Sequence, residues 1–89
     1  MVEREITVSN RLGLHARAAA KLVQLSGRYA ARVTLLCRGR EVNAQSILGV
    51  MMLAAGKGVV LSVRADGGDE EAALAAVVDL FDRKFDEPD

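Results

Sequence analysis

The chain has a single histidine, His15, which lies in the run Gly13-Leu14-His15-Ala16-Arg17. An imidazole nitrogen is a nucleophile near neutral pH. The residues after it have helical spacing, and the free amides at the start of a helix favour an anion. Arg17 adds a permanent positive charge. A nucleophile, a helix start and a cation together predict a site that carries an anion, with phosphate as the expected group.

The alternative for His15 is an inert surface residue or a simple helix cap, since lone histidines are common at surfaces. Gly13 permits an unusual backbone before it, and Arg17 falls within the first helical turn. These neighbours favour a functional histidine.

The sequence offers no metal site and no nucleotide site. Cys37 is the only cysteine and cannot complete a zinc site with one histidine. Gly56-Lys57-Gly58 is too short for a phosphate-binding loop of the Walker type. We therefore expect no metal and no cofactor. The phosphate donor should lie on another protein, which predicts a carrier rather than an enzyme.

Ser46 precedes a short apolar segment, 47–53, and an N-cap role worth about 1 kcal/mol would explain it. That segment is apolar nearly all round, so a helix there cannot bury every side chain in a domain of two layers. The exposed part would form a docking surface, to which methionine adapts well. The alternative is a short helix that is fully buried.

Periodicity indicates the elements that position these residues. Alternation predicts strands over 2–9, 32–37, 40–43 and 59–65. Helical spacing predicts helices over 16–26, 47–53 and after Asp69, which should cap the last one. The first helix should bury Ala16, Ala19, Ala20 and Val23, with Leu22 beside them, and end at Gly27. The last should align Leu74, Val77, Val78, Phe81 and Phe85. We expect the tail, 86–89, to be frayed.

Composition narrows the class of protein. The 89 residues suit one domain, and 51% are hydrophobic, which is enough for a core. Twelve basic and twelve acidic residues give zero net charge, so no nucleic-acid partner is expected. Cys37 should be a buried thiol. The absence of a signal peptide and of a long apolar stretch predicts a cytoplasmic protein without a membrane partner.

Two motifs resemble one protein family. Gly13-Leu14-His15-Ala16-Arg17, with Ala-Ala-Lys-Leu-Val at 19–23, resembles the active-site signature of HPr, the histidine-containing phosphocarrier of the bacterial phosphoenolpyruvate:sugar phosphotransferase system. Val42-Asn43-Ala44-Gln45-Ser46-Ile47-Leu48-Gly49-Val50-Met51 resembles the regulatory serine segment of that family. The element order and the length fit over nearly the whole chain.

The resemblance implies a single HPr-like domain over residues 1–89. Its fold class would be α+β, an open-faced β-sandwich in which three helices cover one face of a four-stranded, mostly antiparallel sheet in the order βαββαβα. The resemblance also implies that enzyme I phosphorylates His15 on Nδ1, that Arg17 supports the phosphate, and that sugar-specific A components receive it.

The resemblance further implies regulation at Ser46, which an HPr kinase/phosphorylase modifies in some bacteria. It makes Lys21, Gln24, Ile47, Leu48 and Met51 candidate partner contacts, with Arg17 and either Lys57 or Arg28 at the basic rim. We expect a monomer. The chain departs from the family at Ala18, where proline is usual, so the histidine site should be less preorganised.

Two other functions stay open. An HPr-like carrier in a nitrogen-related or regulatory branch would share the His15 motif. A protein-binding module with an inert His15 belongs to a different class, and the surrounding Gly13 and Arg17 argue against it. A small ferredoxin-like nucleic-acid binder is less favoured still, because the strands lack stacking aromatics.

Overall fold

The computed structural model describes residues 1–87 of the chain. Along the chain the elements are β1 (Val2–Thr7), α1 (Ala16–Ser26), β2 (Arg32–Cys37), β3 (Arg40–Asn43), α2 (Ile47–Met52), β4 (Val60–Asp66), α3 (Glu70–Asp82) and the short turn η1 (Lys84–Asp86). This order confirms the predicted βαββαβα arrangement, with shifts of one or two residues at some strand ends.

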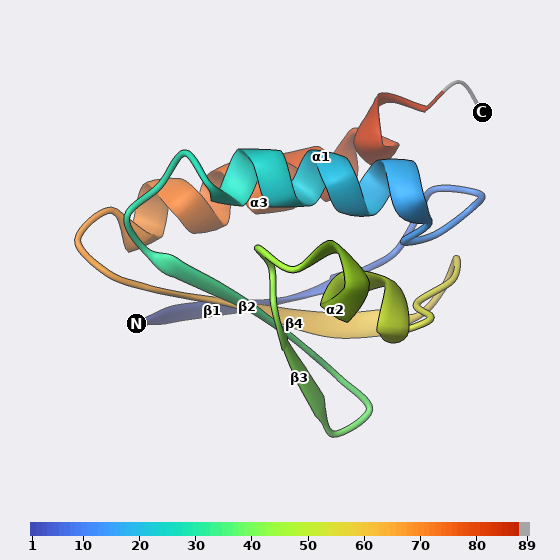
Figure 1. Ribbon diagram of the computed structural model, residues 1–89, viewed down its shortest axis with the longest axis horizontal. Coiled ribbons are helices and arrows are strands. Elements are labelled where there is room, and N and C mark those ends of the chain that lie inside the picture. Colours follow the sequence, from blue (N-terminus) through green and yellow to red (C-terminus); the bar gives the residue numbers. More distant parts are fainter. Residues whose placement is uncertain (88–89) are drawn as a thin grey trace.

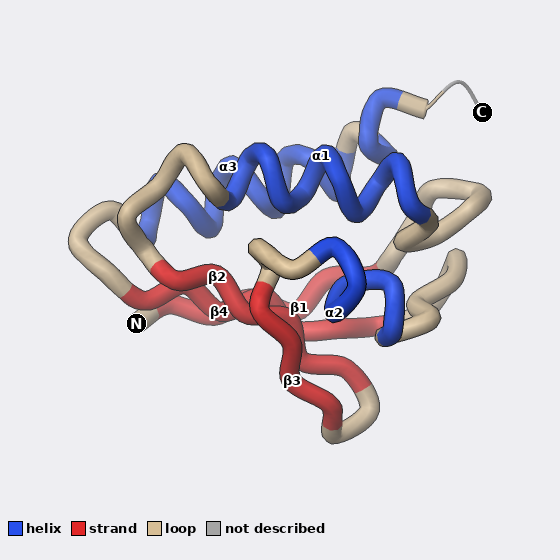
Figure 2. The backbone as a smooth tube through the Cα atoms, in the orientation of Figure 1, coloured by secondary structure: helices blue, strands red, loops and turns tan. Residues whose placement is uncertain are grey.

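The four strands form one sheet in the order β1-β4-β2-β3. Every neighbouring pair is antiparallel. Figures 1 and 2 show the three α-helices over one face of this sheet, so the predicted open-faced sandwich is confirmed. The alternation of β2 turns Val33, Leu35 and Cys37 into the core, as expected, and the Cys37 thiol is buried.

The buried face of α1 differs from the prediction. The helix buries Ala18, Ala19, Leu22 and Ser26. Ala16 is exposed, and Ala20 and Val23 are only half-buried. The reason is that α1 contacts both α2 and α3, so the arc that it buries is turned toward these neighbours as well as toward the sheet. Gly27 does end the helix, but with φ of −67° it needs no left-handed backbone.

Asp69 does not cap α3 with its side chain, contrary to the prediction. Its carboxylate instead accepts hydrogen bonds from the Ala30 N–H at 2.9 Å and the Ala31 N–H at 2.7 Å. These two donors hold the pKa of Asp69 below its usual value. The carboxylate thus ties the loop after α1 to the start of α3.

The end of the chain also differs from the prediction. The helix α3 stops at Asp82, and Lys84, Phe85 and Asp86 all have left-handed backbones, with φ between 55° and 59°. Phe85 is buried and packs edge-on against Phe81, with ring centroids 4.8 Å apart. In Figure 1 the red end of the described chain lies beside the blue start of α1.

The expected fraying of the tail is therefore wrong for the two residues that the structure describes. Asp86 pairs with Arg83 at 3.2 Å, and Glu87 makes the contacts described below. The other two, Pro88 and Asp89, lie outside the described residues. Within residues 1–87, no helix combines the length and hydropathy needed to cross a membrane.

Candidate functional site

His15 is the N-cap of α1, as its place in the sequence predicted. Its backbone is extended, with φ of −75° and ψ of 178°, and its carbonyl accepts the Ala19 N–H at 2.8 Å. Its Nδ1 accepts a hydrogen bond from the Arg17 N–H at 3.2 Å. The imidazole thus occupies the place of a capping side chain and is aimed at the free amides of the first turn.

The loop before His15 is held in place by a close backbone approach. Gly13 has φ of +66°, and a Cβ atom built there would lie 2.5 Å from the Ala55 carbonyl oxygen. The next N–H, that of Leu14, donates to the same carbonyl at 3.0 Å. Only glycine fits this left-handed and crowded position. The chain therefore enters α1 along a defined path, which orients the imidazole.

The second ring nitrogen of His15 contacts the end of the chain. Nε2 lies 3.2 Å from Oε1 of Glu87, and the side chains are 27% and 11% exposed respectively. The buried Asn10 donates to Oε2 of Glu87 at 2.6 Å and to the Gly13 carbonyl at 2.7 Å. Sequence reasoning missed both residues. No spacing or motif in the sequence indicates a role for Glu87 or for Asn10.

These contacts indicate which nitrogen carries the proton. Because Nδ1 accepts the Arg17 N–H, its lone pair lies in the ring plane and is directed at the helix start. A neutral imidazole then has its hydrogen on Nε2, which donates it to Glu87. In this tautomer Nδ1 is the ring nitrogen that bears a lone pair and no hydrogen.

The predicted basic residues occupy two environments. The Arg17, Arg28 and Lys57 side chains are exposed, and so is Gln24. Lys21 is half-buried, and its ammonium donates to the Phe85 carbonyl at 2.6 Å. Lys21 therefore fastens the C-terminal turn to α1, a role that the sequence did not indicate. Among residues 1–87, no cluster of three or more His, Cys, Asp or Glu side chains could hold a metal ion.

Ser46 is the N-cap of α2, as predicted. Its Oγ accepts the Gly49 N–H at 3.0 Å, and its carbonyl accepts the Val50 N–H at 3.0 Å. The Ser46 side chain is exposed to solvent. A group added to its hydroxyl would therefore meet solvent and the amides of the first turn.

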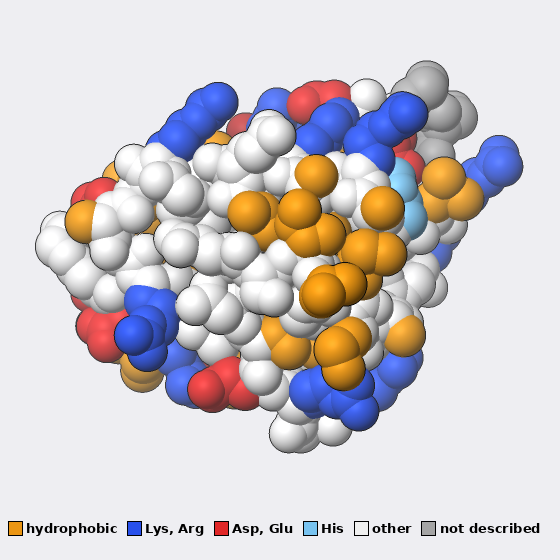
Figure 3. All heavy atoms as spheres, viewed as in Figure 1, with side chains coloured by type: hydrophobic (Ala, Val, Ile, Leu, Met, Phe, Trp, Pro, Cys, Tyr) orange, Lys and Arg blue, Asp and Glu red, His pale blue; other side chains and the backbone are white. Residues whose placement is uncertain are grey.

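The helix α2 buries only one of its residues, Val50. Four large apolar side chains are 38–74% exposed, and we call them the α2 patch: Ile47, Leu48, Met51 and Met52. Figure 3 shows hydrophobic side chains gathered on this face beside the pale-blue histidine, with Lys and Arg side chains around the edge. The alternative of a fully buried short helix is therefore wrong.

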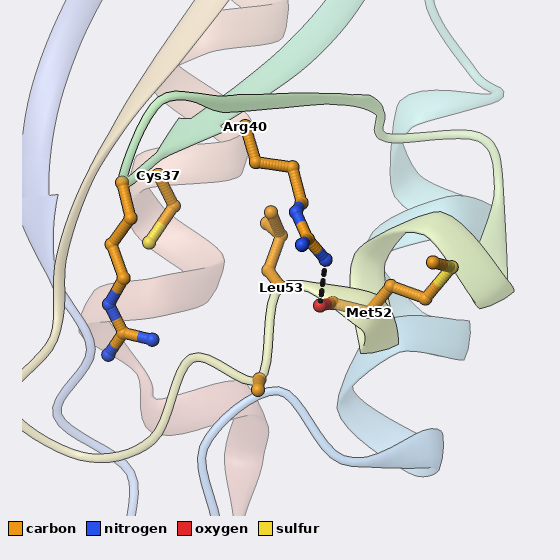
Figure 4. A pocket seen from close by; sticks show the side chains of 6 residues that line it. Cys37, Arg40, Met52 and Leu53 are labelled. Carbon is orange, nitrogen blue, oxygen red and sulfur yellow. Dashed lines mark hydrogen bonds between the residues drawn. The ribbon is translucent and has the colours of Figure 1, made fainter.

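The C-terminal end of α2 is tied to the sheet. The Arg40 guanidinium on β3 donates to the Met52 carbonyl at 3.1 Å, across a pocket of about 210 Å³ next to Cys37 and Leu53 (Figure 4). A cation at this position satisfies a carbonyl that the helix leaves free. With Ser46 at one end and Arg40 at the other, the α2 patch has a defined orientation.

Comparisons with known proteins agree on one family. Residues 2–83 match the family model described as the PTS HPr component phosphorylation site. A protein of Xylella fastidiosa named phosphocarrier protein HPr is 55% identical over 87 residues, 98% of each chain. A protein of Shewanella violacea named phosphocarrier protein NPr is 43% identical over 86 residues, 97% of this chain and 94% of the relative.

Solved structures agree as well. The crystal structure of an HPr from Thermoanaerobacter tengcongensis superposes with a TM-score of 0.95 at 41% identity, over 99% of each chain. An HPr dimer from the same organism gives a TM-score of 0.78 at 41% identity, over 98% of this chain and 100% of that one.

Proposed function

Because the chain belongs to the HPr family of phosphocarrier proteins, which carry a phosphoryl group and are not enzymes, we propose that His15 is its phosphoryl acceptor. Enzyme I of the phosphotransferase system is the donor, and sugar-specific A components are the acceptors. The observation that supports this proposal is the hydrogen bond from the Arg17 N–H to Nδ1, which requires that Nδ1 carries a lone pair and no hydrogen.

In the transfer step, the Nδ1 lone pair forms a bond to phosphorus. The bond between phosphorus and the donor atom breaks, and its electron pair stays with the donor. The hydrogen on Nε2 is retained, so the phosphorylated ring carries a positive charge. Such transfers depend on positioning and on neutralising charge. The Arg17 N–H, released from Nδ1, then becomes a donor for a phosphate oxygen, and the Arg17 guanidinium adds a positive charge.

The α2 patch, with Ile47, Leu48 and Met51 as predicted contacts, supplies the apolar part of the surface that meets both partners. Exposed apolar side chains of this size mark interaction sites. Gln24 and Arg17, both exposed on α1, are the predicted polar rim, and the Arg17 charge suits acidic partner surfaces, which raises the encounter rate. The proposed working form is a cytoplasmic monomer, in which this face is free.

Ser46 is the proposed regulatory site, with an HPr kinase/phosphorylase as the modifying enzyme. A phosphate at a helix start is compatible with the fold of α2. It would add negative charge at the edge of the α2 patch and repel an acidic partner. Phosphorylation of Ser46 should therefore block docking without unfolding the domain.

The proposal is tested by incubating the protein with phosphoenolpyruvate and enzyme I and measuring acid-labile phosphate. The wild-type chain should be labelled and His15→Ala should not be. The control Ser46→Ala should be labelled like the wild type. Label that persists in His15→Ala would place the phosphate on another residue and overturn the assignment. No label in the wild type with the cognate enzyme I would also overturn it and would favour an inert binding module.

A second function is favoured by the NPr name of the Shewanella violacea relative. In that case the carrier belongs to a nitrogen-related or regulatory branch and not to sugar uptake. The rate of phosphorylation by the sugar-branch enzyme I and by its nitrogen-branch counterpart, measured side by side, distinguishes the two. The faster donor identifies the branch.

A further inference from the structure

We propose that Glu87 is a positioning residue for phosphoryl transfer. Its carboxylate, held by Asn10, accepts the Nε2 hydrogen of His15 and selects the tautomer that presents the Nδ1 lone pair to the donor. The effect on transfer rests on the proposed function. The tautomer is a property of the unphosphorylated chain and can be measured without it.

Only one orientation of the Asn10 amide group fits its two hydrogen-bond partners. The two hydrogens of the Asn10 amide group go to Oε2 of Glu87 and to the Gly13 carbonyl. The flipped amide would place its oxygen against two other acceptors, with no hydrogen between them. Asn10 is fully buried in the loop that also carries Gly13 and leads to His15. The loop that positions the imidazole therefore also positions its carboxylate partner.

The C-terminal turn holds Glu87 from the other side. The buried Phe85 ring packs on Phe81, and the Phe85 carbonyl accepts the Lys21 ammonium at 2.6 Å. Three consecutive left-handed residues then reverse the chain toward the start of α1. Because such backbones are costly for residues other than glycine, the surrounding contacts must hold them. Glu87 thus reaches His15 from an anchored turn.

The partners of both ring nitrogens of His15 favour the same tautomer, with the hydrogen on Nε2. A donor, the Arg17 N–H, faces Nδ1, and an acceptor, the Glu87 carboxylate, faces Nε2. The competing tautomer, with hydrogen on Nδ1, would lose both bonds and has no lone pair at the reacting atom. When Nδ1 bonds to phosphorus the ring becomes positive, and its Nε2–H bond to a carboxylate becomes charge-assisted. Glu87 therefore favours the phosphorylated state as well.

The tautomer is tested by ¹⁵N NMR of the unphosphorylated protein labelled at histidine, at a pH where the ring is neutral. With one histidine in the chain, only two ring-nitrogen signals arise. Glu87→Ala should raise the ratio of Nδ1–H to Nε2–H tautomer about fivefold, the factor for loss of one hydrogen bond. Glu87→Gln should give an intermediate ratio, because Asn10 and Nε2–H both donate to the Glu87 carboxylate and glutamine offers only one acceptor oxygen for the two donors. Unchanged shifts in Glu87→Ala would overturn the proposal.

The rate of phosphoryl transfer then separates the effect of the tautomer from the effect of the Glu87 charge. Phosphorylation by phospho-enzyme I should be slowed about tenfold in Glu87→Ala and less in Glu87→Gln, which keeps one acceptor oxygen but loses the negative charge. The matched control is Asp86→Asn, one residue earlier, whose carboxylate pairs with Arg83. It should transfer at the wild-type rate, and circular dichroism should be the same for all variants.

Failure of this inference differs from failure of the proposed function. If the wild type receives phosphate on His15 and Glu87→Ala is equally fast, the positioning role is wrong and the carrier function stands. If the wild type receives no phosphate, the carrier function is wrong, and the NMR ratio alone decides whether Glu87 selects the tautomer.

Discussion

The starts of α1 and α2 use the same local device. Each helix begins with an extended N-cap residue whose side chain accepts an amide hydrogen of the first turn. His15 accepts through Nδ1 at 3.2 Å, and Ser46 accepts through Oγ at 3.0 Å. Both positions are therefore places where added negative charge is tolerated.

Their surroundings differ. His15 has a second polar atom, Nε2, which lies against the half-buried Glu87, whereas the Ser46 side chain is exposed. The helix that follows His15 buries four residues, and the one that follows Ser46 buries one. The geometry of the N-cap is therefore enough to make a helix start that tolerates negative charge. What packs around the helix start is what distinguishes the proposed transfer site at His15 from the proposed regulatory site at Ser46.

The largest expected effect is a loss of stability from a substitution in the loop that leads into α1. Gly13→Ala places a Cβ about 2.5 Å from the Ala55 oxygen in a left-handed backbone and should cost about 3 kcal/mol of unfolding free energy. Urea denaturation measures the loss. The control is Gly39→Ala, where φ is +77° but no atom lies within 4 Å, and the cost should be about 1 kcal/mol. Equal losses would mean that the close approach at Gly13 is unimportant.

The next effect concerns charge at the start of α2. Ser46→Asp should slow transfer to His15 about tenfold by repelling an acidic partner, while circular dichroism stays unchanged. Ser46→Asn is the matched control, because asparagine caps a helix equally well and carries no charge. Transfer at the wild-type rate in Ser46→Asp would contradict a regulatory role for this position.

Removing the cap of α2 should be milder. Ser46→Ala leaves the Gly49 N–H without its acceptor and should lower the unfolding free energy by about 1 kcal/mol. Thermal denaturation gives the loss, and stopped-flow phosphorylation should show that transfer persists. A loss of transfer in this variant would mean that the Ser46 hydroxyl itself takes part in docking, so that both helix starts would act in transfer.

A smaller gain is expected from preorganising α1. Ala18→Pro introduces a fixed φ in the first helical turn, where proline is tolerated, and should add about 0.4–1 kcal/mol. The melting temperature should rise by about 2–6 °C, and His15 should still be phosphorylated. Ala18 is fully buried, so the proline ring must fit its surroundings. A lower melting temperature would show that it does not.

The smallest effect concerns a third helix start, that of α3. The N–H groups of Ala30 and Ala31 lower the pKa of Asp69 below its ordinary 3.8, so its contribution to stability is present above that pH. The contribution is lost as pH falls through the lowered value. In Asp69→Asn the unfolding free energy should therefore fall less steeply between pH 5 and pH 3 than in the wild type. Urea denaturation at each pH measures it. An unchanged slope relative to Asp82→Asn, an exposed control, would contradict this.

Much of the fold follows from local pattern. The period-2 alternation of β2 selects its buried side, and the spacing after His15 and after Ser46 defines both caps and both helices. These features depend on residues no more than about four positions apart, so the sequence shows them directly. The same is true of the exposed α2 patch, since a six-residue helix that is apolar all round has more apolar surface than one neighbour can cover.

Other features were settled only by packing. The buried arc of α1 depends on where α2 and α3 lie, and Asp69 bonds to a loop 38 and 39 residues away instead of capping its own helix. The periodicity of a sequence does not indicate contacts between segments that lie far apart in the chain.

By itself, then, the sequence determined the order of elements and the two capped helix starts, and it predicted His15 as the nucleophile. Only the tertiary structure brought Glu87 to His15 and to Asn10, which are 72 and 77 residues away from it. That meeting requires the sheet order β1-β4-β2-β3, the full length of α3 and a left-handed turn anchored by Phe85. Contacts between distant segments arise from the packing of the whole chain, which local spacing does not encode.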